Sequence, residues 1–481
     1  MNQPKQDRIL AQYNFNPADI IDDNFEDLYQ KRRRDSFFAF AYTRDGICYA
    51  LRDHLGGIPL YYRKTPDGPR FSTNLSDLVV ESDEFDAVGV EAYLRFGTTR
   101  LYPLIKSIGI IPPGSVVEFT SGQSPRIVYQ YVINQSKLVG SISMRELVEE
   151  LDQRMRRAIE RVVVHDPVGL YLSGGIDSAL IGLYLRQLGI GVNAYTSAPW
   201  GKVSSETPFA RENASVIQAR SHTLIELESD DYSSLFSQLV SIYGAPHGTT
   251  TALGVASIWM NSPIVGEQQV FFGQNSDTAT CTVPAQYLTF FTNYLPTLMR
   301  KKIHPAFAQD DLVARYLALG KKLIAGNPNL VSIDIGKELS PLQQLTLAGT
   351  YIAHSPADSE VLSQPAILQG RLVSNPYFDV DVVEFLMAIP MRHRIRLSRK
   401  SRMYLILEKR VLQQLALRYL PADLVFRKKG FTVSLERDRQ AKQFLAKLPE
   451  RIHGIEATTE QARFAAGVLS DWAKWKSVAT D

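Results

Sequence analysis

The residues best suited to chemistry form one short motif that follows an apolar run at 168–172 and precedes a helical pattern. The motif consists of Ser173, Gly174, Gly175, Ile176, Asp177 and Ser178. Two glycines let the backbone approach a phosphate closely, and the amides at the start of a helix favour an anion. The two serines add hydroxyl donors, and Asp177 can hold a Mg²⁺ that bridges phosphate oxygens. The motif therefore predicts a phosphate site, although it is neither a Walker A loop nor a GxGxxG fingerprint.

Two kinds of element pattern surround this motif. Residues 1–135 carry short aromatic and β-branched runs separated by turn residues, which predicts a β-rich domain of mainly antiparallel strands. From 143 to 162, apolar residues recur at helical spacing behind Ser143, a candidate N-cap with Glu146 three positions on, which is the capping-box pattern. Strands then alternate with helices, which favours a parallel sheet covered on both faces, and the chain beyond about 340 is mostly helical. We expect an α/β domain over residues 140–481.

Composition excludes several classes of protein. The chain has 481 residues, 45% hydrophobic and 21% charged, as a folded globular protein has. Its 53 Lys and Arg nearly balance 50 Asp and Glu, so charge does not imply a nucleic-acid partner. Two cysteines, with no CxxC pair, predict neither a zinc site nor a disulfide framework. Because no apolar run is long enough to span a bilayer and no signal peptide is evident, we expect a cytoplasmic protein.

The SGGxDS motif resembles the pyrophosphate loop of the ATP pyrophosphatase superfamily, and further motifs narrow the resemblance to asparagine synthetase. Those motifs are an RDxxGxxPLYY stretch at 52–62, an FxS strand at 71–74, an LPPG-like turn at 111–114, a GAP segment at 244–246, a PFLD-like motif at 375–379 and an RxKxxF-like motif at 427–431. The resemblance covers nearly the whole chain, from about residue 36 to about 435. It implies a glutaminase-like N-terminal domain, degenerate and truncated here, and an adenylating synthetase domain that uses ATP and Mg²⁺.

The N-terminal part departs from that family in its nucleophile. Glutamine-dependent asparagine synthetase uses an N-terminal cysteine, whereas the second residue here is Asn2. The segment before Arg52 is also about half the length that such a domain needs. Cys48 and Cys281 fit core thiols better than nucleophiles. We therefore expect no glutamine hydrolysis.

A second loop, Gly273 to Thr278, lies where the family has GxGxDE. Asp277 keeps the acidic position, so the resemblance implies that Asp177 and Asp277 together hold magnesium pyrophosphate. Asn275 replaces a glycine and tolerates a left-handed conformation. Gln274 stands where asparagine synthetases carry Glu and β-lactam and carbapenam synthetases carry Tyr. Glutamine cannot act as a general base, so Gln274 is expected to position a substrate through hydrogen bonds.

The base used by either relative is missing, because Leu372 lies near the place of the family glutamate. His247 or Glu267 could substitute, although a structural role for each is favoured.

Two lysines are carried over from the resemblance. Lys429 falls where the family has a lysine that stabilises charge on the adenylate and the leaving group, with Lys428 as a rival one residue away. Lys400 resembles a second family lysine near the phosphates. The alternative is that Lys400 is an ordinary surface lysine with no role in the site.

The leading hypothesis is an AMP-forming amide synthetase that takes its amine from the substrate, as β-lactam, carbapenam and lasso-peptide macrolactam synthetases do. The alternatives are an ammonia-dependent synthetase of the asparagine type and a catalytically silent binding homologue. The expected partner is a small molecule or peptide that carries both a carboxylate and an amine, with a substrate-delivering partner protein left open. No nucleic acid or membrane partner is expected, and no oligomeric state is predicted.

Overall fold

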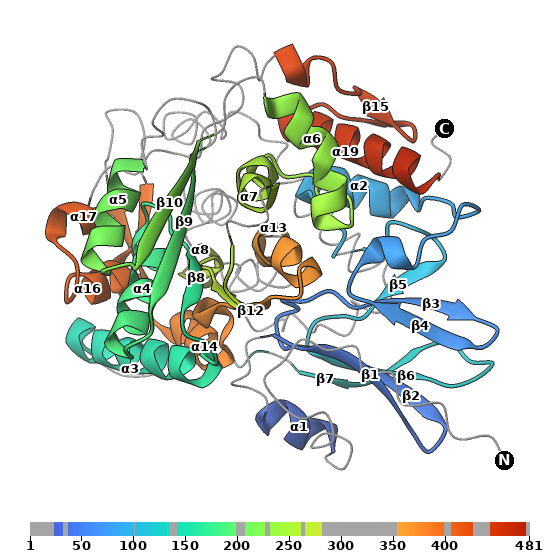
Figure 1. Cartoon of the computed structure of the whole chain (residues 1–481). Helices are drawn as coiled ribbons and strands as arrows, with labels where there is room; N and C mark the ends of the chain where they lie inside the picture. The colour runs from blue at the N-terminus through green and yellow to red at the C-terminus, as the bar shows by residue number, and fades with distance from the viewer. Residues whose placement is uncertain are drawn as a thin grey trace, which may run out of the picture.

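The computed structural model describes the chain in segments: residues 24–31, 37–100, 102–131, 133, 142–198, 207–226, 231–260, 265–280, 354–398, 406–426 and 443–477. Within them, no helix is both long and apolar enough to cross a membrane. Figure 1 shows a group of antiparallel sheets beside a parallel sheet that helices cover. This mixed α/β architecture is the one expected from the sequence.

The antiparallel strands form two sheets, in the orders β1-β2-β6-β7 and β4-β3-β5. Their bounds are β1 Ala39–Arg44, β2 Ile47–Arg52, β3 Tyr61–Thr65, β4 Gly68–Ser72, β5 Ile108–Ile110, β6 Ser115–Phe119 and β7 Arg126–Gln130. Asp45 and Gly46, both with positive φ, make the tight turn between β1 and β2. One short helix of this part is α2, Ala87–Phe96, which Asp86 caps by accepting from Gly89 N–H. Two further elements of this part are α1, Phe25–Lys31, and the 3₁₀ turn η3, Leu75–Asp77.

The parallel sheet has the strand order β10-β9-β8-β11-β12. Its strands are β8 Val168–Tyr171, β9 Val192–Ala198, β10 Ser221–Glu226, β11 Gln269–Phe271 and β12 Leu372–Ser374. Alternate residues of a strand point to opposite faces, so Leu170 and Phe271 enter one core while Tyr171 and Val270 enter the other. Both faces are therefore buried, which explains the continuous apolar runs of these strands.

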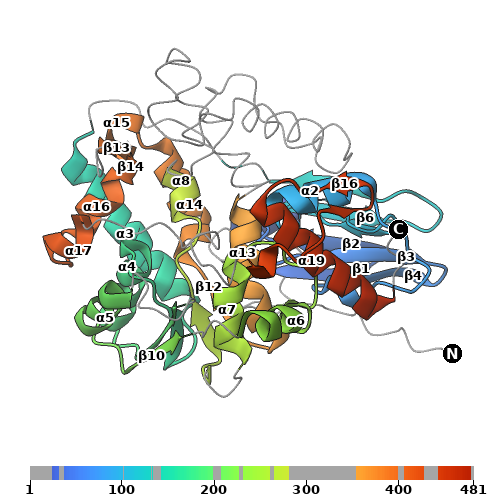
Figure 2. The same ribbon diagram turned by 90° about the horizontal axis from the view of Figure 1, so that it is seen from above.

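Helices cover both faces of this sheet (Figures 1 and 2). The helices described are α3 Met144–Val162, α4 Ile176–Gln187, α5 Thr207–Val216, α6 Asp231–Tyr243, α7 Thr251–Met260, α8 Ser276–Thr280, α13 His354–Leu368, α14 Val380–Ala388, α15 Met391–Arg394, α16 Arg410–Ala416, α17 Ala422–Phe426 and α19 Glu460–Lys476. The 3₁₀ turn η5, Pro376–Phe378, and the strand pairs β13 Ile395–Ser398 with β14 Ile406–Lys409 and β15 Arg451–Ile452 with β16 Ile455–Glu456 complete them. Ser143 caps α3 and forms a capping box with Glu146, as its sequence predicts.

The Arg52-Asp53 pair of the RDxxGxxPLYY stretch stabilises a turn. The guanidinium of Arg52 is fully buried and donates to the carbonyl oxygens of Ile58, Gly56 and Ile111 at 2.5, 2.7 and 3.0 Å. The carboxylate of Asp53 accepts from three backbone N–H groups of the loop that follows. All of these contacts lie within the antiparallel part, so this motif is structural.

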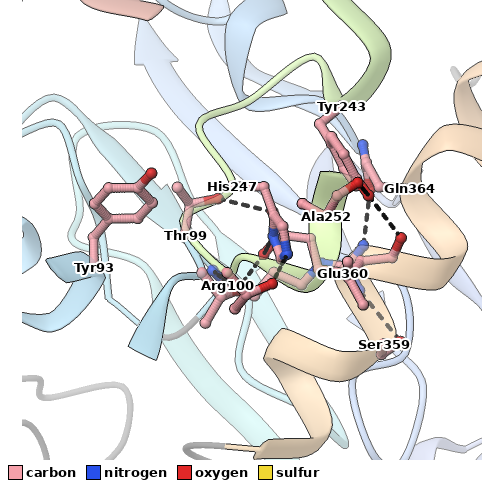
Figure 3. A network of polar contacts seen from close by, with 12 residues as sticks. Tyr93, Thr99, Arg100, Tyr243, His247, Ala252, Ser359, Glu360 and Gln364 are labelled. Atoms are coloured by element: carbon pink, nitrogen blue, oxygen red, sulfur yellow. Dashed lines mark hydrogen bonds and ion pairs between the residues drawn. The ribbon is translucent and has the colours of Figure 1, made fainter. Parts of the chain in front are cut away.

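A buried arginine joins the antiparallel strands to α13 (Figure 3). Arg100 follows α2 and donates to Gly57 O at 2.7 Å and to Gln364 Oε1 at 2.8 Å. Longer hydrogen bonds reach the hydroxyls of Ser359 and Ser363, at 3.4 and 3.3 Å. The guanidinium thus binds α13 to the turn before β3.

Glu360 of α13 supplies the opposite charge in this network. Its carboxylate accepts from the hydroxyls of Thr98 and Thr99, and one oxygen lies 3.4 Å from His247 Nδ1. Burial alone would raise the pKa of Glu360, but His247, Arg100 and Thr98 outweigh it and lower the pKa below its ordinary value. Glu360 is therefore a buried carboxylate, and the charges of the network balance across the junction.

The C-terminal helix α19 also returns to the N-terminal part of the chain. It packs on α2 and α6, and Trp472 Nε1 donates to Ser76 Oγ at 2.8 Å (Figure 2). On the sheet side, Phe37 stacks on Phe272 with ring centroids 5.9 Å apart. A single apolar cluster consequently continues from the antiparallel strands into the parallel sheet.

Replacement Glu360→Gln tests the buried network. It removes the negative charge that acts most strongly on buried Arg100, so the free energy of unfolding at neutral pH should fall by about 3 kcal/mol, measured by urea denaturation. Because folding lowers the pKa of Glu360, its contribution is present above the ordinary value of 4.5 and is lost as the pH falls below it. The difference between wild type and variant should narrow on acidification.

The control is Glu84→Gln, which removes an exposed partner of Lys106. It should change stability little at any pH, because exposed ion pairs contribute little. A Glu360→Gln effect no larger than that of Glu84→Gln would contradict the buried-charge account.

Candidate active site

The SGGIDS motif forms a closed loop between β8 and α4. Gly175 N–H donates to Ser173 Oγ at 3.0 Å, and Ser173 N–H donates to Ser178 Oγ at 3.1 Å. Gly175 is the N-cap of α4, and no side chain caps the helix there. The first amides of α4 therefore keep donors for an anion, as the motif predicts.

Asn213 of α5 supports this loop from outside. Its Nδ2 donates to Ser173 O at 3.1 Å and to Gly175 O at 3.4 Å. Asn213 is buried, and it was not among the residues predicted for the site. Its amide therefore satisfies two carbonyl oxygens of the loop and ties the loop to α5.

The second loop, between β11 and α8, lies directly against the first. A Cβ on Gly273 would stand 3.1 Å from Ser178 N and 3.2 Å from Asp177 C, so a side chain here would push the two loops slightly apart. Gln274 follows and is half-buried at the carboxyl edge of the sheet. Because β8 and β11 are adjacent parallel strands, the acids that follow them, Asp177 and Asp277, meet at one edge.

Asn275 adopts the left-handed conformation expected for it, with φ of 76°. Its Nδ2 donates to Tyr377 O at 2.6 Å, and Asn375 Nδ2 donates back to Gln274 O at 2.9 Å. The two asparagines thus fix the loop to the NPYFD segment after β12. Tyr377 is buried beneath the site, and its hydroxyl donates to Asp177 O at 3.3 Å.

A buried lysine joins the two acids. Lys409 Nζ lies 2.6 Å from Asp177 Oδ2, 2.9 Å from Asp277 Oδ1 and 2.8 Å from Ser276 Oγ. Burial alone would lower the pKa of Lys409, but Asp177 and Asp277 outweigh it and raise the pKa above its ordinary value. Lys409 is therefore a cation at this place.

The sequence prediction missed Lys409. The residue lies 232 positions from Asp177, and no local motif links the two. One signal was available, because Lys409 lies two positions before the apolar pair Val411-Leu412. A lysine in such surroundings is buried only when an acid accompanies it.

Asp177 offers a further ligand atom. Its Oδ2 pairs with Lys409, while its Oδ1 is buried without a hydrogen-bond partner. Asp277 is half-exposed and keeps a solvent-facing side. Carboxylate oxygens are the donors that Mg²⁺ takes, so these residues fit that ion. In the described ranges, no group of three or more His, Cys, Asp or Glu could hold a metal by itself. Phosphate oxygens and water would therefore have to complete its coordination.

The remaining predicted residues fall into two groups. Lys400, Lys428 and Lys429 lie outside the described residues, so their assignment stays a prediction. His247 and Glu267 are buried in the interior, which fits the structural role favoured for each.

The hydrogen bonds of these two residues are structural. His247 Nε2 contacts Thr249 Oγ1 at 2.8 Å, and Glu267 accepts from Asn193 and Tyr195. Because Glu267 precedes β11, it lies at the opposite edge of the sheet from Asp277. Neither residue is placed to act as a base beside the two acids.

Asn275 variants test the second loop. Asn275→Gly keeps the left-handed backbone and loses the bond to Tyr377 O, which should lower the free energy of unfolding by about 1 kcal/mol. Asn275→Ala loses the bond and strains the backbone, so the loss should be about 2 kcal/mol. Chemical denaturation of both variants measures the difference. Equal losses would show that the conformation at this position carries no strain.

Parts of this chain are similar in sequence to known proteins. The family model described as Asparagine synthase matches residues 150–318 and 369–471, more than half of the chain. Among curated proteins, "Asparagine synthetase [glutamine-hydrolyzing] 1" of Bacillus subtilis (strain 168) is 24% identical over 178 residues. That alignment covers 36% of this chain and 28% of the relative's length.

Among solved structures, an NH3-dependent NAD synthetase from Campylobacter jejuni matches with 15% identity and a TM-score of 0.21. The match covers 44% of this chain and 96% of that one. Both loops and Lys409 lie inside the segments that the family model matches. The chain belongs to the Asparagine synthase family.

Proposed function

We propose that this protein is an ATP-dependent carbon–nitrogen ligase that forms AMP and pyrophosphate. It adenylates a substrate carboxylate, and a substrate amine then displaces AMP to give an amide. The observation that carries the proposal is the convergence of Asp177, Asp277 and Lys409 beside a glycine loop at the carboxyl edge of a parallel sheet. Edges of this kind are where α/β folds bind nucleotides.

The site residues would have different roles in the first step, the attack on ATP. The amides at the start of α4 and the hydroxyls of Ser173 and Ser178 would bind the β- and γ-phosphates. Asp177 and Asp277 would hold Mg²⁺, and the bound ion would neutralise negative charge on the pyrophosphate. Lys409 adds a fixed positive charge next to the same oxygens. These groups stabilise charge that grows as the bond from the α-phosphorus to pyrophosphate breaks.

The reaction balances in two steps. A carboxylate oxygen attacks the α-phosphorus, and pyrophosphate leaves with the electron pair of the broken bond. The amine nitrogen then attacks the acyl carbon, loses a proton and expels AMP. Gln274, at the mouth of the site, would orient the substrate through its amide, and Lys429 and Lys400 are expected to stabilise the adenylate and the phosphates.

The amine is proposed to come from the substrate and not from glutamine. Cys48 lies in β2, and burial raises the pKa of its thiol to about 11, which makes it a poor nucleophile. A substrate with its own amine would close a ring, so a lactam or macrolactam is the product class proposed. The substrate would be a small molecule or peptide that carries both groups, with a partner protein delivering it as an additional hypothesis.

ATP–pyrophosphate exchange over a panel of carboxylates tests the proposal. The panel runs from aspartate and glutamate to amino-diacids and acidic peptides. Exchange confined to a substrate with its own amine supports lactam formation, whereas exchange with aspartate points to an ammonia-dependent synthetase of the asparagine type. No exchange with any acid in the panel, together with no ATP binding, would instead indicate a silent binding homologue.

Asp177→Asn is the matched variant for this assay. It removes the charge that holds the cation while keeping the side-chain shape, so exchange should fall at least about a thousandfold. The control is Asn193→Ala at the opposite edge of the sheet, which should keep exchange. Wild-type exchange by Asp177→Asn would refute the metal assignment.

A further inference from the structure

The ammonium of Lys409 has all of its donors satisfied by Ser276 and by the two acids that the proposed function assigns to magnesium. Its three N–H groups face Asp177, Asp277 and Ser276 at 2.6 to 2.9 Å. Only 8% of the side chain is exposed, so the charge is held in place and is poorly screened. The pair of acids is thus already partly neutralised before any ligand arrives.

That arrangement opposes the binding of a free divalent cation. Without Lys409, two adjacent carboxylates would repel each other and attract a cation strongly. With it, a metal at the same carboxylates meets a positive charge a few ångströms away. Asp177 Oδ1, which is buried without a hydrogen-bond partner, is by itself a weak ligand for a strongly hydrated ion.

A triphosphate changes this balance. Its oxygens bring negative charge that offsets both the metal and the ammonium, and they supply the ligands that the protein lacks. The carboxylates then need to contribute only one or two of the metal's bonds. The site is therefore suited to a metal–nucleotide complex and unsuited to the metal alone.

We propose that Lys409 is an internal counterion that excludes free Mg²⁺, so that the site takes the metal only together with the triphosphate. This inference rests on the proposed function. It makes Lys409 a positioning residue: in the free protein it keeps the two acids together, and it selects the form in which the metal enters.

Equilibrium binding of Mn²⁺, followed by calorimetry and by its paramagnetic resonance signal, tests the inference on the full chain. Wild type should not bind free Mn²⁺ below about 1 mM. Lys409→Met removes the charge at similar size and should bind free Mn²⁺ at least about tenfold more tightly than wild type. Lys409→Arg keeps the charge and should exclude free Mn²⁺ as wild type does. Adding Asp277→Asn to Lys409→Met should abolish the gain.

Binding of Mn²⁺ with a non-hydrolysable ATP analogue is measured on the same proteins. Wild type that binds the metal–nucleotide complex but also binds free Mn²⁺ below about 1 mM would overturn this inference and leave the proposed function standing. Unchanged free-metal affinity in folded Lys409→Met would overturn it as well. Wild type that binds neither form would overturn the proposed function. Because the wild-type measurements need no variant, the inference stays testable even if Lys409→Met does not fold.

Discussion

The contact of one buried ammonium with two carboxylates determines how the site is arranged. Asp177 and Asp277 follow adjacent parallel strands, so their charges are forced to one edge of the sheet. Lys409, from the start of α16, offsets part of that charge and ties a third segment to both loops. Removing water from such a pair of acids would be costly without a cation beside them. The phosphate loop, the second loop and the C-terminal helices are therefore held in one geometry by electrostatics.

Residues outside the two loops hold them in place through hydrogen bonds. Asn213 satisfies the carbonyls of the first loop, and the reciprocal bonds of Asn275 and Asn375 fix the second. Asn375 follows β12, and β12 follows α13, whose Glu360 is buried against the antiparallel part. The N-terminal sheets thus support the helix that leads into the site. The described N-terminal strands therefore have a structural role in positioning α13.

Sequence reasoning succeeded where the signal is local. The glycine loop, the capping box of α3 and the left-handed Asn275 each depend on neighbouring residues, so a short window of sequence suffices to predict them. It failed where pairing is distant. Lys409 ends strand β14 and Asn213 lies in α5, and nothing near Asp177 in sequence indicates either residue. The junction of Arg100 with α13 was missed for the same reason. An arginine that follows a helix is normally expected on the surface.

Asp177 and Asp277 are proposed to hold jointly the metal of a bound nucleotide. The most direct test is a crystal structure with Mn²⁺ and a non-hydrolysable ATP analogue, in which anomalous scattering locates the metal. The account predicts one anomalous peak within bonding distance of both carboxylates and of the β- and γ-phosphate oxygens. A peak bound to the phosphates alone, with Lys409 still in contact with both acids, would contradict it.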